Sequence, residues 1–133
     1  MALQDMNADP MMQHLWAALE RGETIGHYGR LVFAMVARHF VQEEELVRCL
    51  QRDPECSEAD AKALFTQVQG RDYNPPRRER ILEWQAQQEF PICPNADDPD
   101  ACNVYKNLKF PDDVYQHIQE HQQKKAEAGE EAA

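Results

Sequence analysis

The sequence predicts an all-α protein, a compact bundle of five to six helices with a long cysteine-containing loop before the last helix. Three observations lead to this prediction. Apolar residues recur at the three- and four-residue spacing of a helix face, helix-starting and helix-stopping residues bound these segments, and no alternating strand pattern of useful length appears. A chain of 133 residues is large enough for one domain with a modest core.

The first half of the chain carries three helical patterns. Residues 1–9 are expected to form a short flexible lead, and Pro10 then opens a helix that Gly22 ends. Residues 31–40 are the most apolar segment and are expected at the centre of the core. The third helix is expected over residues 42–52, because three glutamates at its start favour the positive end of the helix dipole.

Two more helices follow in the middle of the chain. Ser57 with Asp60 three residues later is typical of a capping box, and the helix that follows ends at Gly70. An Asn-Pro-Pro break then interrupts the chain. The fifth helix is expected over about residues 77–88, where apolar residues return.

A long loop precedes the last predicted helix. Residues 90–104 are rich in proline and aspartate and predict a loop, and Pro111 starts the last helix of a single helical domain over residues 10–123. Residues 124–133 form an acidic tail that we expect to be disordered. A loop of about twenty residues is unusual in a compact domain and is typically functional or held in place, so the two cysteines inside it are candidates to hold it.

Charge and targeting signals narrow the functional classes. The chain has 14 Lys and Arg against 24 Asp and Glu, a net charge of −10, which disfavours a general coat for nucleic acid or membrane. No apolar run is long enough to span a membrane, and the N-terminus has no secretory pattern, so a cytoplasmic location is expected. Glycine-rich phosphate loops, nucleophile elbows and paired-histidine zinc motifs are missing, so we expect no enzymatic activity.

The four cysteines are Cys49, Cys56, Cys93 and Cys102, and their spacing leaves three alternatives open. They are unrelated thiols, or one metal site made by all four, or a redox switch or disulfides. Thiolates suit an iron–sulfur cluster or zinc, but no pair has the short spacing of a zinc finger. The last three cysteines lie in loop contexts beside Pro or Asp, which favours a metal site.

One short segment reverses the acidic character of the chain. It contains Arg71, Arg77, Arg78 and Arg80 close to Tyr73. Arginines beside aromatic residues can hold a phosphate backbone and stack a base, which makes these five residues candidates for nucleic-acid binding. The alternative is that the arginines pair with carboxylates elsewhere in the chain.

The middle of the chain resembles the helical C-terminal modules of primases, over about residues 26–105. Three features carry the resemblance in the first part of this range: the glycine-containing start of an early helix (29–35), a short acidic stretch (42–46) and an Asn-Pro-Pro turn (73–76). Two cysteine segments that each contain an aromatic residue follow, at residues 90–94 and 101–105. The cysteine segments are similar to the iron–sulfur domain of the primase large subunit. The resemblance implies a helical domain that grips primer or template nucleic acid and holds an iron–sulfur cluster through four cysteines.

Two functions are therefore expected from the sequence. The first is a small non-enzymatic protein that binds a metal through the four cysteines, a 4Fe-4S cluster first and zinc second, and serves as a nucleic-acid or replication accessory module. The alternative is an acidic, metal-free adaptor that binds a basic protein partner.

Overall fold

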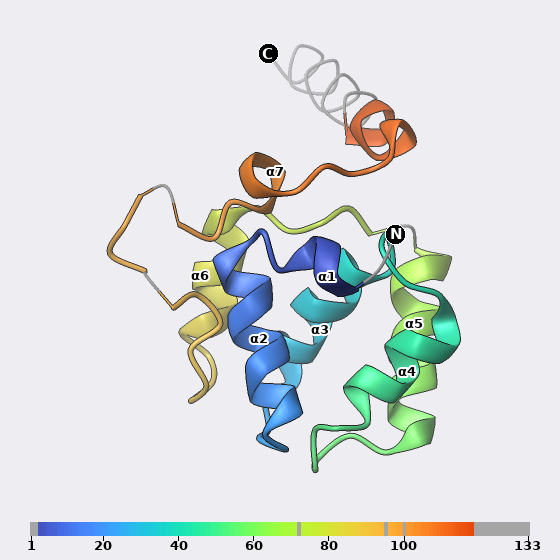
Figure 1. Cartoon of the computed structure of the whole chain (residues 1–133). Coiled ribbons are helices and arrows are strands. Elements are labelled where there is room, and N and C mark those ends of the chain that lie inside the picture. The colour runs from blue at the N-terminus through green and yellow to red at the C-terminus, as the bar shows by residue number, and fades with distance from the viewer. Residues whose placement is uncertain (1–2, 72, 95, 100, 119–133) are drawn as a thin grey trace, which may run out of the picture.

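The computed structural model describes residues 3–71, 73–94, 96–99 and 101–118. Within these ranges the chain forms helices and no strand, which confirms the predicted all-α class (Figure 1). The predicted tail over residues 124–133 lies outside the described residues.

The helices follow one another with short connections as far as α6. They are α1 (Leu3–Met6), α2 (Pro10–Glu20), α3 (Gly26–Ala37), α4 (Glu43–Leu50), α5 (Glu58–Gly70), α6 (Arg78–Gln85) and α7 (Val104–Asn107). Residues 112–118 are also helical. No helix in the described ranges is both long enough and apolar enough to cross a membrane.

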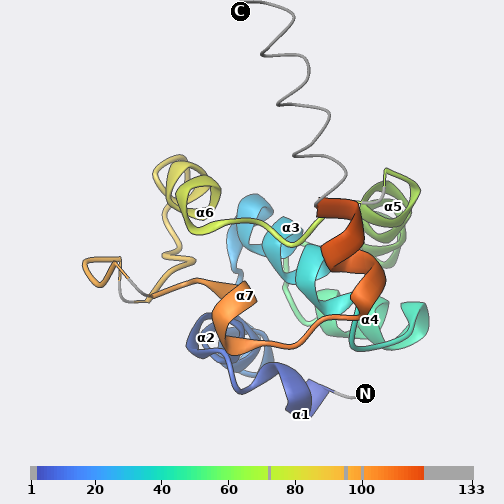
Figure 2. The same ribbon diagram turned by 90° about the horizontal axis from the view of Figure 1, so that it is seen from above.

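Helix α3 lies at the centre of the bundle. It packs against α2, α4, α5 and α6, which surround it when the molecule is seen from above (Figure 2). Every residue from Val32 to Ala37 is buried, which confirms that the most apolar segment forms the core. The helix begins at Gly26, earlier than the predicted 31–40. Gly29 permits this, because a Cβ there would lie only 3.0 Å from the Cβ of Ile25.

The N-terminal residues are part of the bundle. Residues 3–6 form α1 and Met6 is buried, although residues 1–9 were expected to form a flexible lead. Asp9 caps α2 by accepting a hydrogen bond of 2.9 Å from a backbone N–H of its first turn, and Pro10 occupies the first helical position. The other carboxylate oxygen of Asp9 accepts a 2.9 Å hydrogen bond from Asn107, so the start of the chain is attached to α7.

Helices α4 and α5 form a second layer against α3. The predicted capping box of α5 is confirmed: the Ser57 hydroxyl accepts from the Asp60 N–H at 3.1 Å, and the Asp60 carboxylate accepts from the Ser57 N–H at 3.2 Å. The α4–α5 connection is therefore fixed by its own sequence.

A buried carboxylate joins this connection to the start of α3. Asp53 is fully buried and accepts hydrogen bonds from the backbone of Ile25 (2.9 Å), the hydroxyl of Thr24 (3.0 Å), the guanidinium of Arg30 (2.9 Å) and the backbone of Glu55 (2.8 Å). We call these five residues the Asp53 corner. The Asp53 carboxylate thereby holds the α4–α5 connection against the start of α3.

The segment after α6 differs from its prediction in one respect. Residues 90–94, 96–99 and 101–103 form a loop, as predicted, but α7 adds one helical turn before the helix over residues 112–118. Its four residues are too few to produce a readable apolar pattern. The turn is held by the buried side chain of Val104, whose carbonyl also accepts the Leu108 N–H.

Candidate functional site

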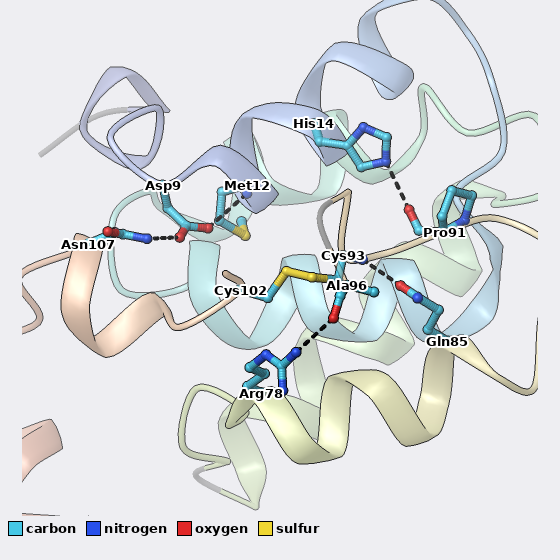
Figure 3. The surroundings of a disulfide bond; sticks show 10 residues. All are labelled: Asp9, Met12, His14, Arg78, Gln85, Pro91, Cys93, Ala96, Cys102 and Asn107. Carbon is cyan, nitrogen blue, oxygen red and sulfur yellow. Dashed lines mark hydrogen bonds between the residues drawn. A yellow bond between two sulfur atoms is a disulfide. The ribbon is translucent and has the colours of Figure 1, made fainter. Parts of the chain in front are cut away.

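The four predicted cysteine ligands fall into two groups. Cys93 and Cys102 form a disulfide with Cα atoms 5.7 Å apart (Figure 3). Cys49, in α4, and Cys56, in the α4–α5 connection, are buried and carry free thiols. The structure thus brings together two of the four sulfurs, in the bonded form that was one of the alternatives left open by their spacing.

The long loop that contains the disulfide is attached to α6 and α2 by hydrogen bonds. The Cys93 N–H donates to the side-chain oxygen of Gln85 at 2.6 Å, and the guanidinium of Arg78 donates to the Ala96 carbonyl at 2.8 Å. On the α2 side, a ring nitrogen of His14 hydrogen-bonds to the Pro91 carbonyl at 2.8 Å (Figure 3). The disulfide and these hydrogen bonds hold the described parts of the loop against the two helices.

The predicted metal site requires several ligand side chains to lie close together. Among the described residues, which include all four cysteines, no three His, Cys, Asp or Glu side chains form a group that could hold a metal ion. Burial raises the pKa of the Cys49 thiol to about 11 and also raises that of Cys56, so both are protonated at neutral pH. Among the described side chains, the sulfurs of Cys93 and Cys102 lie together and no third ligand joins them, so the arrangement described brings together two of the four sulfurs that the predicted site needs. The 4Fe-4S or zinc site made by the four cysteines stays a prediction.

Three of the five predicted nucleic-acid residues line one cavity. This cavity has a volume of about 520 Å³, and its polar and aromatic walls are formed by Tyr73, Asn74, Arg77, Arg80, Trp84 and Tyr105. Its apolar walls are formed by Leu31, Met35, Pro75, Pro76 and Ile118. We call this cavity the Arg77 groove.

The other two predicted residues lie beside the groove. The Arg71 guanidinium donates to the Tyr73 hydroxyl at 3.2 Å. Arg78 lines a neighbouring cavity of about 430 Å³, which it shares with Arg77 and Tyr105. The segment that the sequence singled out therefore surrounds a concave surface rather than scattering over the molecule.

The aromatic walls of the groove are held by contacts behind them. The Trp84 ring stacks on Tyr28, with centroids 5.9 Å apart and planes at 16°. The Tyr105 ring packs against Phe110 at 5.6 Å, and its hydroxyl donates to the Pro75 carbonyl. These rings are fixed before any ligand arrives, which favours binding because little side-chain entropy is lost.

The electrostatic character of the groove is opposite to that of the chain. None of the described residues that line it is Asp or Glu, although the chain carries 24 of them. The exposed guanidinium of Arg80 forms an ion pair of 3.3 Å with Glu83 beside the groove. The hydrogen bond from Arg71 lowers the pKa of Tyr73, and burial raises the pKa of Tyr105 to about 12 although the charge of Arg77 opposes this.

Part of the groove had a signal in the sequence and part had none. Arg80 and Trp84 lie four residues apart on one side of α6, and Arg77 immediately precedes this helix as its N-cap residue. Leu31 and Met35 were missed because they belong to the most apolar segment and read as core. Tyr105 was missed because the tertiary fold alone brings α7 next to the Asn-Pro-Pro turn.

Comparisons with protein-family models, with curated proteins and with solved structures give no match. The function of this chain therefore has to be inferred from its own residues and from the cavity that they form.

Proposed function

We propose that this chain is a helical accessory module that binds single-stranded nucleic acid in the Arg77 groove. The observation that carries the proposal is the wall of the groove, where two arginines and three aromatic rings meet and no described lining residue is acidic, in a chain with a net charge of −10. A cavity whose described lining holds arginines and no carboxylate, in so acidic a chain, supports binding of an anion there.

The chemistry of these side chains matches that of an unpaired nucleotide. The guanidinium groups of Arg77 and Arg80 offer planar arrays of donors for phosphate oxygens. Tyr73, Trp84 and Tyr105 offer rings to bases that are not stacked in a duplex, and such stacking contributes about 1–3 kcal/mol per base. The resemblance of residues 26–105 to primase helical modules supports the same function.

The test is fluorescence anisotropy of a labelled oligothymidine over a series of salt concentrations. The double variant Arg77→Glu/Arg80→Glu should weaken binding and make the slope of log K against log salt shallower by about 1.4, because two phosphate contacts are lost at about 0.7 each. Arg48→Glu/Lys62→Glu is the matched control, since it makes the same change of net charge at two exposed residues that line neither cavity. Absence of binding at low salt, or equal binding by the double variant and the control, would falsify the proposal.

The metal site is a separate prediction with its own test. The observation in its favour is the proximity of Cys93 and Cys102, whose two sulfurs become neighbouring thiols when the disulfide is reduced. Anaerobic purification followed by elemental analysis should find iron with sulfide, or zinc, in stoichiometric amount. Metal-free protein with four titratable thiols after reduction would exclude it and leave the nucleic-acid proposal in place.

The adaptor that binds a basic protein is the second candidate function. The observation that favours it is the first turn of α4, where Glu43 and Glu44 are exposed beside Glu45. This candidate expects an oligoarginine peptide to bind, and Glu43→Gln/Glu44→Gln to weaken that binding while Glu79→Gln does not. Binding of the peptide with no binding of oligothymidine would replace the first proposal by this one.

A further inference from the structure

The two cavities beside α6 are contiguous. The Arg77 groove and the neighbouring cavity, which we call the Arg78 cavity, share the lining residues Arg77, Tyr105 and Ile118. The Arg78 cavity is completed by Arg78, Glu79, Asn103 and Tyr115, among others. A ligand that occupies both would cross the ridge formed by the three shared residues.

The arginines around these cavities differ in how much of their hydrogen-bonding capacity is used. Arg71 is bonded to Tyr73 and Arg80 to Glu83. Arg77 is exposed, and its guanidinium makes no hydrogen bond or ion pair within the described part of the chain. It is one of the three residues of the ridge, and its charge opposes the rise that burial causes in the pKa of Tyr105, which is another.

Arg78 has donors left as well. Its Nη2 bonds to the Ala96 carbonyl at 2.8 Å, as Figure 3 shows, but its Nε is buried and has no hydrogen-bond partner among the described residues. Arg78 therefore brings a positive charge to the Arg78 cavity and uses only part of its hydrogen-bonding capacity on Ala96.

The Arg78 cavity has three further polar lining residues, Tyr115, Asn103 and Glu79. The Tyr115 hydroxyl accepts the Phe110 N–H at 3.1 Å and keeps its own proton available to donate. Asn103 supplies a side-chain amide. Glu79 is the one carboxylate among the described lining residues, and it is exposed, where solvent screens its repulsion of an anion.

From these observations we infer that the two cavities form one nucleotide site, with the base in the Arg77 groove and its phosphate in the Arg78 cavity between Arg77 and Arg78. This inference rests on the proposed function and assigns the parts of the ligand within it. The shared chemistry is an aromatic base joined to a phosphate, whether the phosphate belongs to a strand or to a free nucleotide.

The test compares two labelled oligothymidines on the full chain, one with a phosphodiester backbone and one with an uncharged methylphosphonate backbone. Arg77→Gln should weaken binding of the phosphodiester probe, with a salt slope shallower by about 0.7, and leave the methylphosphonate probe unchanged. Trp84→Ala should weaken both probes alike, because it removes stacking and no charge. Arg48→Gln, an equal change of net charge outside both cavities, is the control.

The outcomes separate this inference from the function on which it rests. If the phosphodiester probe binds but Arg77→Gln weakens both probes equally, or neither, the phosphate assignment is overturned and single-strand binding stands. If neither probe binds, both are overturned. Competition by thymidine 5′-monophosphate but not by thymidine supports the assignment with a free nucleotide as ligand, and competition only by oligothymidine supports it with a strand.

Discussion

The Asp53 corner and the Arg77 groove both contain arginine side chains, but the two regions differ in how far their polar groups are already hydrogen-bonded. In the Asp53 corner the carboxylate receives four hydrogen bonds, from two backbone N–H groups, one hydroxyl and the guanidinium of Arg30, and it is fully buried. In the groove, the side chain of Arg77 is exposed, and its guanidinium makes no hydrogen bond or ion pair within the described part of the chain.

This difference indicates which region stabilises the fold and which is available to a ligand. Buried polar groups with every partner in place hold elements together, whereas a charged group left without partners beside an apolar cavity retains its hydrogen-bonding capacity for another molecule. If the comparison is right, substitutions in the corner should change the free energy of unfolding, and substitutions of Arg77 should change binding alone.

The largest effect is expected for Asp53→Ala. The guanidinium of Arg30 is only 15 % exposed, so removing its partner leaves a nearly buried charge uncompensated, and the free energy of unfolding should fall by about 3–5 kcal/mol. Urea denaturation of both proteins at neutral pH measures this. Glu55→Gln is the matched control, since the Glu55 carboxylate is exposed in the same corner and its loss should change stability by less than about 1 kcal/mol. Equal effects of the two substitutions would mean that the buried Asp53 carboxylate contributes no more to stability than the exposed Glu55 carboxylate.

The next largest effect concerns the disulfide beside the groove. Cys93→Ser should lower the stability of the oxidised protein by about 2–3 kcal/mol, because the covalent link restricts the unfolded chain across a separation of nine residues. Unfolding with and without a dithiol reductant provides the control, since reduced wild-type protein should match the variant. Wild-type stability that does not respond to the reductant would mean that the hydrogen bonds from Gln85 and Arg78 hold the loop without the disulfide.

A smaller effect is expected on acidification. Burial alone would raise the pKa of Asp53, but hydrogen bonds from the backbone of Glu55 and Ile25 and from Arg30 and Thr24 lower it below the ordinary value. The unfolded chain therefore takes up this proton first, and the contribution of Asp53, present above a pH of about 4, is lost as pH falls toward the folded-state pKa. Each unit of difference corresponds to about 1.4 kcal/mol. Asp53→Asn should show a shallower loss between pH 5 and 3, and an equal loss would contradict the assignment.

Much of the corner's surroundings could be predicted from local sequence. Two features depend on residues only three or four positions apart: the capping box at Ser57 and Asp60, and the apolar segment of α3. Both can therefore be recognised in the sequence. The Asp53 network itself was not predicted, because its donors at Thr24, Ile25 and Arg30 lie far away along the chain.

The groove, too, could be predicted only where its residues lie close together in the sequence. The arginines and Tyr73 could be identified because they are close in sequence and stand out against an acidic chain. Tyr105 could not, because only the folding of α7 against the Asn-Pro-Pro turn brings it there. For the cysteines, the sequence favoured a metal site over disulfides, and the pairing of Cys93 with Cys102 was not foreseen because it depends on how the loop returns to α6.

The smallest expected effect completes the comparison. Arg77→Gln should change the free energy of unfolding by no more than about 0.5 kcal/mol, because an exposed side chain without partners in the described ranges contributes nothing that glutamine cannot replace. The same urea experiment used for Asp53→Ala measures it. A much larger loss would mean that Arg77 holds the groove together, and any loss of oligothymidine binding by this variant would then report unfolding. Unchanged stability with weakened phosphodiester binding is the result expected of a residue that serves the ligand.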